Sequence, residues 1–184
     1  MKKPNKLLDA AVIVNSLICL LSIAGIVYIL LGTNLDLFYK VEGIFDLIAL
    51  LFATIYYVSG YSKESADMFK AFLLVSTINA LVVVVVEISE MTSVVSLIFS
   101  LISLVIIGYL ALGLNIGKNN SIGLCILLVI LKVLCLIMSI VMANSSILYP
   151  SNILLVSQLA LSLTILVSTC AKYIDKAERK SNKK

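Results

Sequence analysis

The sequence predicts an all-α fold, a polytopic bundle of six transmembrane helices that forms a single domain over residues 1–184. Of these residues, 61% are hydrophobic and only 13% are charged, whereas soluble domains carry about a quarter charged residues. The mean hydropathy is +1.15. Apolar runs near the about 20 residues that cross a bilayer recur along the chain with short connections. The predicted spans are residues 7–31, 41–59, 71–87, 92–112, 122–143 and 153–171.

The first two spans are bounded by polar segments. The span at 7–31 follows the lysine-rich segment MKKPNK, and Ser22 and Ala24 offer the small-residue pattern of a signal-peptide cleavage site. Its apolar run exceeds the roughly 7 to 15 residues of a signal peptide, so we predict that the span is retained. The span at 41–59 is followed by Gly60, which suits the left-handed conformation that commonly ends a helix.

The later spans contain one ambiguous run, because residues 82–86 in the third span are all valine. In water such a β-branched run favours a strand, but within a bilayer only a helix satisfies the backbone groups of an isolated segment. The fourth span is predicted to end at Gly113, and Pro150 lies in the linker between the fifth and sixth spans. Helices are therefore predicted throughout.

Positive charge is distributed unevenly among the connections. If the N-terminus is cytoplasmic, the cytoplasmic segments hold all but two of the 14 lysine and arginine residues, the exceptions being Lys40 in an outer connection and Lys132 within the fifth span. Short loops rich in these residues are retained on the cytoplasmic side. We therefore predict that both termini are cytoplasmic. As a separate expectation, we assign the protein to the plasma membrane of a bacterium.

The C-terminal segment 172–184 is basic, because its lysine and arginine residues outnumber Asp175 and Glu178. We expect it to extend the sixth helix and to lie on anionic lipid headgroups, where each cation contributes about 1 kcal/mol. The net charge of +4 resides in the two tails and not on a folded domain. No nucleic-acid partner is therefore expected.

The cysteines all lie in apolar runs and lack the spacing of redox or zinc motifs. We predict free thiols that pack as small apolar residues, and we expect neither a metal nor a cofactor. One of them, Cys170, adjoins the basic tail and is a candidate for palmitoylation in a eukaryotic host, but simple packing is the favoured interpretation. The four are Cys19, Cys125, Cys135 and Cys170.

Each span also carries small or polar residues at helical spacing. In lipid, small residues let helices approach closely and hydroxyl groups bond between helices, so uncharged stripes are expected mainly to hold the bundle together. Charged residues are more costly to bury and usually face a partner or a wet cavity. The clearest uncharged stripe comprises Ser93, Ser96, Ser100 and Ser103 in the fourth span.

Lys132 is the residue on which a functional interpretation depends, because it stands in the middle of the fifth span. A lysine at the bilayer centre costs about 2.5 to 3.5 kcal/mol on insertion scales. One expectation is a buried pair with Asp46. Helical side chains lean toward the N-terminus of their helix, however, and this lean would place Lys132 among the polar residues at mid-depth. These are Asn79, Ser100 and Thr164.

Carboxylates gather at the outer ends of the predicted spans, beside a single outer cation, Lys40. A mouth lined by one sign of charge raises the local concentration of the opposite ion. An equally good explanation is that the positive-inside rule leaves acidic residues free to lie outside. The residues of this predicted acidic mouth are Asp36, Glu42, Asp46, Glu87 and Glu90.

Signatures of catalysis are missing from the sequence. It has no histidine, which excludes Ser-His and Cys-His pairs and the HExxH metalloprotease motif. The stretch from Gly43 to Asp46 lacks the second glycine of the GxGD pattern of intramembrane aspartyl proteases. We therefore do not expect an enzyme.

Two functions remain open. In the first, the protein binds or translocates a small solute or ion through a polar interior around Lys132, which serves as a gate charge or an anion ligand with Asp46 and Glu87 as its counter-charges. In the second, it is a non-transporting accessory, interaction or immunity-type protein whose polar stripes pack helices, a second copy of the chain or a partner subunit. A bundle that encloses a polar cavity at Lys132 would favour the first function, and one that closes tightly on it would favour the second.

In size and number of spans the chain is similar to substrate-binding subunits of vitamin-uptake transporters and to some bacteriocin self-immunity proteins. The resemblance covers hydropathy alone. The AxxxA pattern sought in the first span of such a subunit is absent, since Asn15 stands four residues after Ala11. The resemblance therefore does not decide between the two functions.

Overall fold

The computed structural model describes residues 6–32, 36–58, 65–89, 93–112, 119–142, 146 and 148–181. Within these ranges it contains six α-helices and no strand, and every helix is long and apolar enough to span a membrane. The predicted all-α, multi-span membrane fold is confirmed at this level. The helices are α1 (Lys6–Gly32), α2 (Leu37–Val58), α3 (Ser65–Ser89), α4 (Val94–Ala111), α5 (Asn119–Met142) and α6 (Pro150–Ser181).

The helix bounds differ from the apolar spans. Hydropathy marks only the part of a helix that suits lipid, whereas backbone hydrogen bonding continues through polar ends. For this reason α3 begins at Ser65, inside a polar segment, and α6 continues through basic sequence to Ser181. α4 begins later than its apolar run because Ser93 caps it, with Oγ accepting the N–H of Ser96 at 3.2 Å. Gly60 and Gly113 lie outside the described residues.

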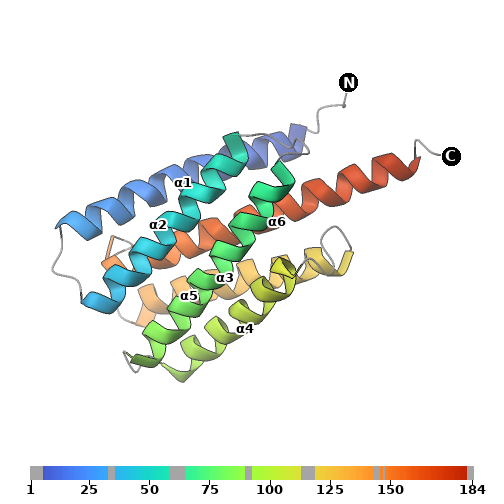
Figure 1. Cartoon of the computed structure of the whole chain (residues 1–184). Helices are drawn as coiled ribbons and strands as arrows, with labels where there is room; N and C mark the ends of the chain where they lie inside the picture. The colour runs from blue at the N-terminus through green and yellow to red at the C-terminus, as the bar shows by residue number, and fades with distance from the viewer. Residues whose placement is uncertain are drawn as a thin grey trace.

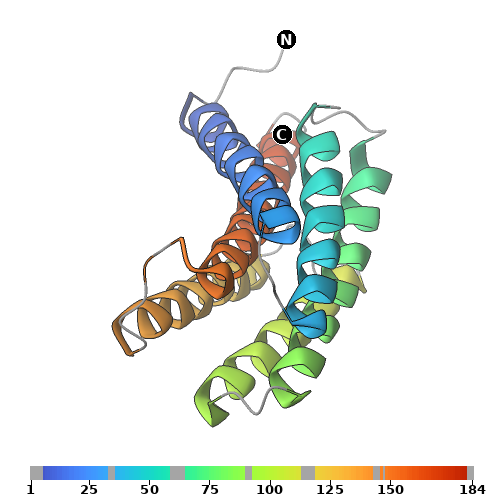
Figure 2. The same cartoon turned by 90° about the vertical axis from the view of Figure 1, so that its left-hand side faces the viewer.

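α6 is the central helix of the bundle. It packs against α1, α2 and α5, and 67% of its apolar span is buried, compared with 22–44% for the other five helices. α3 packs between α2 and α4, and α4 packs in turn against α5. Figure 2 shows α6, in red and orange, between α1 and α5, with α2 and α3 beside them. A polar residue on α6 can therefore meet side chains from both halves of the chain.

Both chain termini lie at the same end of the bundle, which we call the terminal end (Figure 1). The ends of α1, α3 and α5 lie at the other end, which we call the opposite end. The starts of α2, α4 and α6 and the final turns of α3 and α5 consequently meet at the opposite end. This placement decides which polar groups of the sequence come together.

The outer surface of the bundle is apolar along much of its length. Large side chains that include Leu21, Leu31, Val58 and Val105 are exposed. In water such a surface would be unusually apolar for a monomer, whereas the acyl chains of a bilayer solvate it well. The distribution of exposed residues thus agrees with the length and hydropathy of the helices.

An aromatic cluster, which we define as Tyr56, Phe69 and Phe72, lies inside the bundle near the terminal end. The ring centroids of Tyr56 and Phe69 lie 5.2 Å apart, and those of Phe69 and Phe72 lie 6.1 Å apart. All three side chains are buried. The Nζ atom of Lys172 on α6 lies 3.7 Å from the centroid of Phe69, a cation–π contact. The cluster and this contact join α2, α3 and α6 near the terminal end.

Gly43 allows α2 to lie close to both α1 and α6. A Cβ atom at this position would lie 3.4 Å from Leu30 Cδ2 and 3.5 Å from Leu154 Cδ2. A methyl group here would make ordinary van der Waals contact with both residues, and only a longer side chain would push against them. The close approach holds the neighbouring Glu42, and Asp46 one turn further along α2, against the central helix.

Candidate binding site

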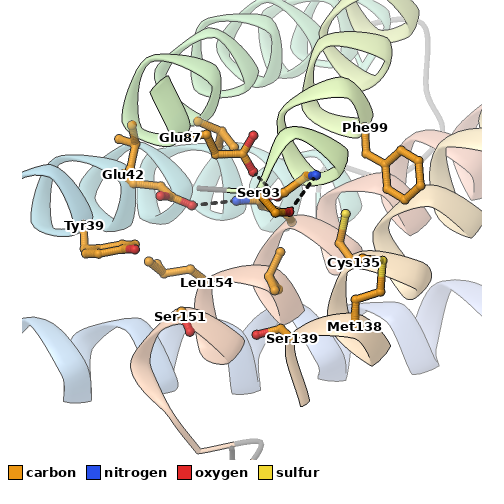
Figure 3. A pocket seen from close by; sticks show the side chains of 15 residues that line it. Tyr39, Glu42, Glu87, Ser93, Phe99, Cys135, Met138, Ser139, Ser151 and Leu154 are labelled. Atoms are coloured by element: carbon orange, nitrogen blue, oxygen red, sulfur yellow. Dashed lines mark hydrogen bonds between the residues drawn. The ribbon is translucent and has the colours of Figure 1, made fainter. Parts of the chain in front are cut away.

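A cavity of about 400 Å³ lies between α2, α3, α4, α5 and α6 at the opposite end of the bundle (Figure 3). Its volume falls within the about 300–1,000 Å³ that is usual for small-molecule sites. Its wall combines carboxyl, amide and hydroxyl groups with apolar side chains. The lining residues are Tyr39, Glu42, Val83, Val86, Glu87, Ser93, Ser96, Phe99, Cys135, Met138, Ser139, Ser151, Leu154, Leu155 and Gln158.

Two carboxyl groups line this cavity. Glu42 comes from α2 and Glu87 from α3, and Figure 3 shows them on the same side of the pocket. Among the described residues that line the cavity there is no lysine or arginine. The aromatic ring of Phe99 and the thioether of Met138 belong to the apolar part of the wall. The cavity is therefore acidic and partly apolar.

A hydrogen-bonded chain of three buried side chains leads from this cavity toward the middle of the bundle. Gln158 Nε2 donates to Glu42 Oε1 at 2.7 Å, and Lys132 Nζ donates to Gln158 Oε1 at 2.7 Å. Each of these side chains is 5–6% exposed. The amide of Gln158 therefore donates to a carboxyl group of α2 and accepts from the ammonium group of α5 at the same time. We call this arrangement the Glu42–Gln158–Lys132 chain.

A second cavity of about 20 Å³ lies at the inner end of that chain and is lined by Lys132, Gln158, Ser76 and Asn79. Ser76 Oγ and Asn79 Oδ1 are buried and have no hydrogen-bond partner among the described residues. The volume suffices for one water molecule, and water in protein interiors usually makes about three hydrogen bonds. Lys132 and these two acceptors supply the polar groups that such a water needs.

Asp46 is fully buried beside the Glu42–Gln158–Lys132 chain but is not part of it. One carboxylate oxygen accepts a hydrogen bond from Asn79 Nδ2 at 2.6 Å, and the other accepts from Ser157 Oγ. Asn79 comes from α3 and Ser157 from α6. Asp46 therefore joins α2 to both helices, and it lines neither cavity.

The expected direct pair between Lys132 and Asp46 is wrong. No ion pair joins these two residues, both of which are described, because the ammonium group donates to Gln158 and the carboxylate is occupied by neutral donors. The physical reason is that α6 lies at the centre of the bundle and places an amide where a carboxylate of α2 was expected. The other expectation, which placed Lys132 among polar residues at mid-depth, agrees better with the structure, since Lys132 and Asn79 line the same small cavity.

Glu87 joins α3 to α4 at the rim of the larger cavity. Its Oε1 accepts a hydrogen bond from Ser96 Oγ at 2.7 Å. Ser96 belongs to the serine stripe of α4, so one member of that stripe binds a charged group of the cavity wall. The remaining stripe members Ser100 and Ser103 are buried, but neither lines a cavity.

Thr164 lies on a different face of α6 from Gln158, the hydrogen-bond partner of Lys132. It accepts a hydrogen bond from Asn15 Nδ2 at 2.8 Å, and the same Asn15 nitrogen donates to the hydroxyl of Tyr57 at 2.7 Å. These contacts connect α1, α2 and α6. Among the mid-depth candidates, the structure thus places Asn79 next to Lys132 and assigns Thr164 to another contact.

The predicted acidic mouth is only partly assembled. Glu42 and Glu87 line the larger cavity, and Asp46 lies deeper. Asp36 is exposed just before α2 and lines neither cavity. Glu90 lies outside the described residues. The acidic character of the site therefore comes from two side chains on different helices and not from a ring of five.

Gln158 is the residue of the candidate site that sequence reasoning missed. A signal was present, because it is the only glutamine in the sequence and it stands within an apolar helix. Tyr39, Ser139 and Ser151 also line the cavity. Ser139 stands seven residues after Lys132, on the polar stripe of the fifth span, whereas nothing in the spacing of Tyr39 or Ser151 distinguishes them from other residues near helix ends.

All four cysteines are free thiols, and Cys135 lines the larger cavity. Across the described part of the chain, no three cysteine, aspartate or glutamate side chains come together in a way that could hold a metal ion. Cys19 and Cys125 face the central helix, where their sulfur atoms contact Thr164 and Thr169.

No protein-family model, no curated protein and no solved structure matches this chain. The cavity and the buried polar groups that support it are therefore the features from which a function can be inferred.

Proposed function

We propose that this protein is an integral protein of the bacterial plasma membrane that binds or translocates a small solute or ion through its polar interior around Lys132. The observation that carries the proposal is the cavity of about 400 Å³ whose wall holds the buried carboxyl group of Glu42 and the half-buried one of Glu87. Polar packing alone requires no such hollow, and charged residues within a membrane usually serve a substrate or ion path. No enzymatic step is part of the proposal.

The residues of the site have different tasks in this proposal. Glu42, Glu87 and Gln158 line the larger cavity and contact the solute. Lys132 lines only the smaller cavity and is a positioning residue, because its hydrogen bond holds the Gln158 carbonyl and so directs the amide nitrogen toward Glu42. Asp46, Asn79 and Ser157 hold α2, α3 and α6 together behind the site.

Translocation requires a path to the terminal end as well. The aromatic cluster and the Lys172 contact stand between the larger cavity and that end. In a translocation cycle α2 and α3 would separate from α6 at the terminal end while the cavity closes, as in the alternating access of other transporters. If the cluster never opens, the protein binds its solute without moving it.

The orientation places the larger cavity on the outer face of the membrane, since both termini are proposed to be cytoplasmic. Cysteines introduced at Ser146, at the opposite end, and at Ser181, at the terminal end, test this orientation. We expect an impermeant thiol reagent to label the first in intact cells and the second only after lysis. Labelling of both positions in intact cells would contradict the orientation.

The native Cys135 tests the binding function itself. In purified protein in lipid nanodiscs, methyl methanethiosulfonate, a small neutral reagent, should modify Cys135 faster than Cys19 and Cys125, as measured by peptide mass spectrometry. The last two thiols are fully buried and line neither cavity. The variant Ser151→Trp should fill the cavity and slow the reaction, whereas Ser89→Trp on the exposed end of α3 should not.

Equal and slow modification of all three thiols would contradict a solute-accessible cavity. That result would favour the non-transporting accessory, interaction or immunity-type function, in which the buried polar groups only hold helices or a partner subunit together.

A further inference from the structure

We propose that the ligand of the larger cavity is a small organic cation, a protonated or quaternary amine that carries an apolar group. This inference rests on the proposed binding function and specifies the chemical class of the solute. It is argued from the charge of the wall, from its apolar part and from the absence of a metal-type ligand set among the described residues.

The charge of the wall selects a cation. Glu42 is only 6% exposed, and its single side-chain hydrogen bond from a described residue reaches Oε1, from Gln158. The second oxygen of this carboxyl group is therefore left for a ligand in the cavity that Glu42 lines. Glu87 adds a second carboxyl group to the same wall. An anionic solute would meet both groups and no lysine or arginine among the described lining residues.

The apolar wall selects an organic group. Phe99 and Met138 belong to the lining on the α4 and α5 side, with Val83 and Leu155 from α3 and α6. The face of an aromatic ring attracts an ammonium group electrostatically, and the ring also packs against apolar groups. Hydrophobic and aromatic walls with a few polar groups are typical of sites for small organic molecules.

A bare metal ion fits the site less well. Hard cations such as calcium take about six to eight oxygen ligands, and the described residues provide no group of three side chains that could hold a metal. The volume of about 400 Å³ also far exceeds that of a dehydrated ion. A cation with an organic group can contact the carboxyl groups and also fill the remaining volume of the cavity.

The rate of Cys135 modification reports occupancy of the cavity, because this thiol is part of its wall. The probe is benzyltrimethylammonium. Benzenesulfonate serves as an anion with a similar aromatic group, and sodium serves as a cation with no organic group. We expect only benzyltrimethylammonium to slow the reaction of Cys135 with methyl methanethiosulfonate, and to do so saturably. Glu42→Gln and Glu87→Gln should each raise the half-protecting concentration about tenfold, as expected when one charged contact is lost.

Asp67→Asn is the matched control, since Asp67 is an exposed carboxylate that pairs with Lys70 near the terminal end. It should leave protection unchanged. Protection by benzenesulfonate or sodium, or no protection by millimolar benzyltrimethylammonium, would overturn the proposed ligand class. If Cys135 of the unliganded protein is nevertheless modified rapidly, only the ligand class is contradicted and the binding function is not. Slow modification of Cys135 in the unliganded protein would contradict both the binding function and the ligand class.

A second measurement uses the wild-type chain and so does not depend on the folding of a variant. Two methanethiosulfonate reagents differ in charge, one carrying a trimethylammonium group and the other a sulfonate. The rate of each reagent with Cys135 is divided by its rate with a free thiol in solution. This corrected rate should be at least about tenfold higher for the cationic reagent than for the anionic one, because a cavity lined by one sign of charge concentrates the opposite charge. Equal corrected rates would overturn the inference.

Discussion

The ammonium group of Lys132 donates to the amide oxygen of Gln158 at 2.7 Å, and the same amide donates to Glu42. A neutral side chain of the central helix thus stands between the buried cation of α5 and a carboxyl group of α2. Glutamine suits this position because its two ends accept and donate separately. A change at Lys132 is consequently expected to act on Glu42 through Gln158.

Substitution of Gln158 tests this connection. Gln158→Leu keeps a similar volume but leaves Lys132 and Glu42 without their hydrogen-bond partner, which costs about 1–3 kcal/mol for each buried group. We expect a clear fall in the thermal unfolding midpoint of the detergent-solubilised protein. Ser162→Ala is the control, because the Ser162 hydroxyl bonds only to the backbone carbonyl of Gln158 in its own helix. Equal midpoints for both variants would show that the amide is not a connecting group.

The Lys172 contact with Phe69 is expected to stabilise the closed terminal end. Lys172→Met removes the cation and should cost about 0.5–1 kcal/mol, whereas Lys172→Arg should retain most of the interaction. The measurement is a double-mutant cycle with Phe69→Leu, read by chemical unfolding. A coupling energy near zero would mean that Lys172 does not hold this end through the ring of Phe69.

The basic end of α6 is expected to bind anionic lipid. α6 continues to Ser181, and at about 1.5 Å per residue a helix of 32 residues is about 48 Å long, more than the about 30 Å of a hydrocarbon core. A peptide of residues 172–184 should bind vesicles with anionic lipid more tightly than neutral vesicles, and added salt should weaken the binding. Equal binding to both kinds of vesicle would refute an electrostatic role of the tail.

The helical fold was predictable because lipid simplifies the problem. A segment of about 20 apolar residues has to satisfy its own backbone groups, so hydropathy alone predicts six helices even where residues 82–86 are all valine. The helix ends were not predictable in the same way. Ser65 and Ser181 extend helices into polar sequence, where no change of hydropathy marks the last backbone hydrogen bond.

The site was predictable only in part. Lys132, Asn79 and Glu87 stand out in the sequence because polar or charged groups are rare in spans. Their partners depend on which helices are neighbours and on how each is rotated, and neither is encoded in local sequence. The amide that meets Lys132 comes from α6 because this helix is central and packs against both α5, which carries Lys132, and α2, which carries Asp46.

Lys132→Met tests whether the buried chain serves the cavity or only the packing. Loss of the cation leaves Gln158 without a donor and Glu42 without the nearby positive charge, and removing one partner of a buried charged group costs about 3–5 kcal/mol. Adding Glu42→Gln should restore most of the unfolding midpoint, since two facing amides satisfy each other. Adding Asp46→Asn should restore less, because Asp46 accepts from Asn79 and Ser157. Lys70→Met, at an exposed lysine, is the control.

The most direct test of a solute-binding interior is protection of Cys135 in the double variant Lys132→Met with Glu42→Gln. We expect the unfolding midpoint to return toward that of the wild-type protein while the half-protecting concentration of benzyltrimethylammonium remains about tenfold above the wild-type value, because the fold needs matched partners and the ligand needs the carboxylate of Glu42. Recovery of both properties, with protection at the wild-type concentration, would contradict a binding role for this buried chain.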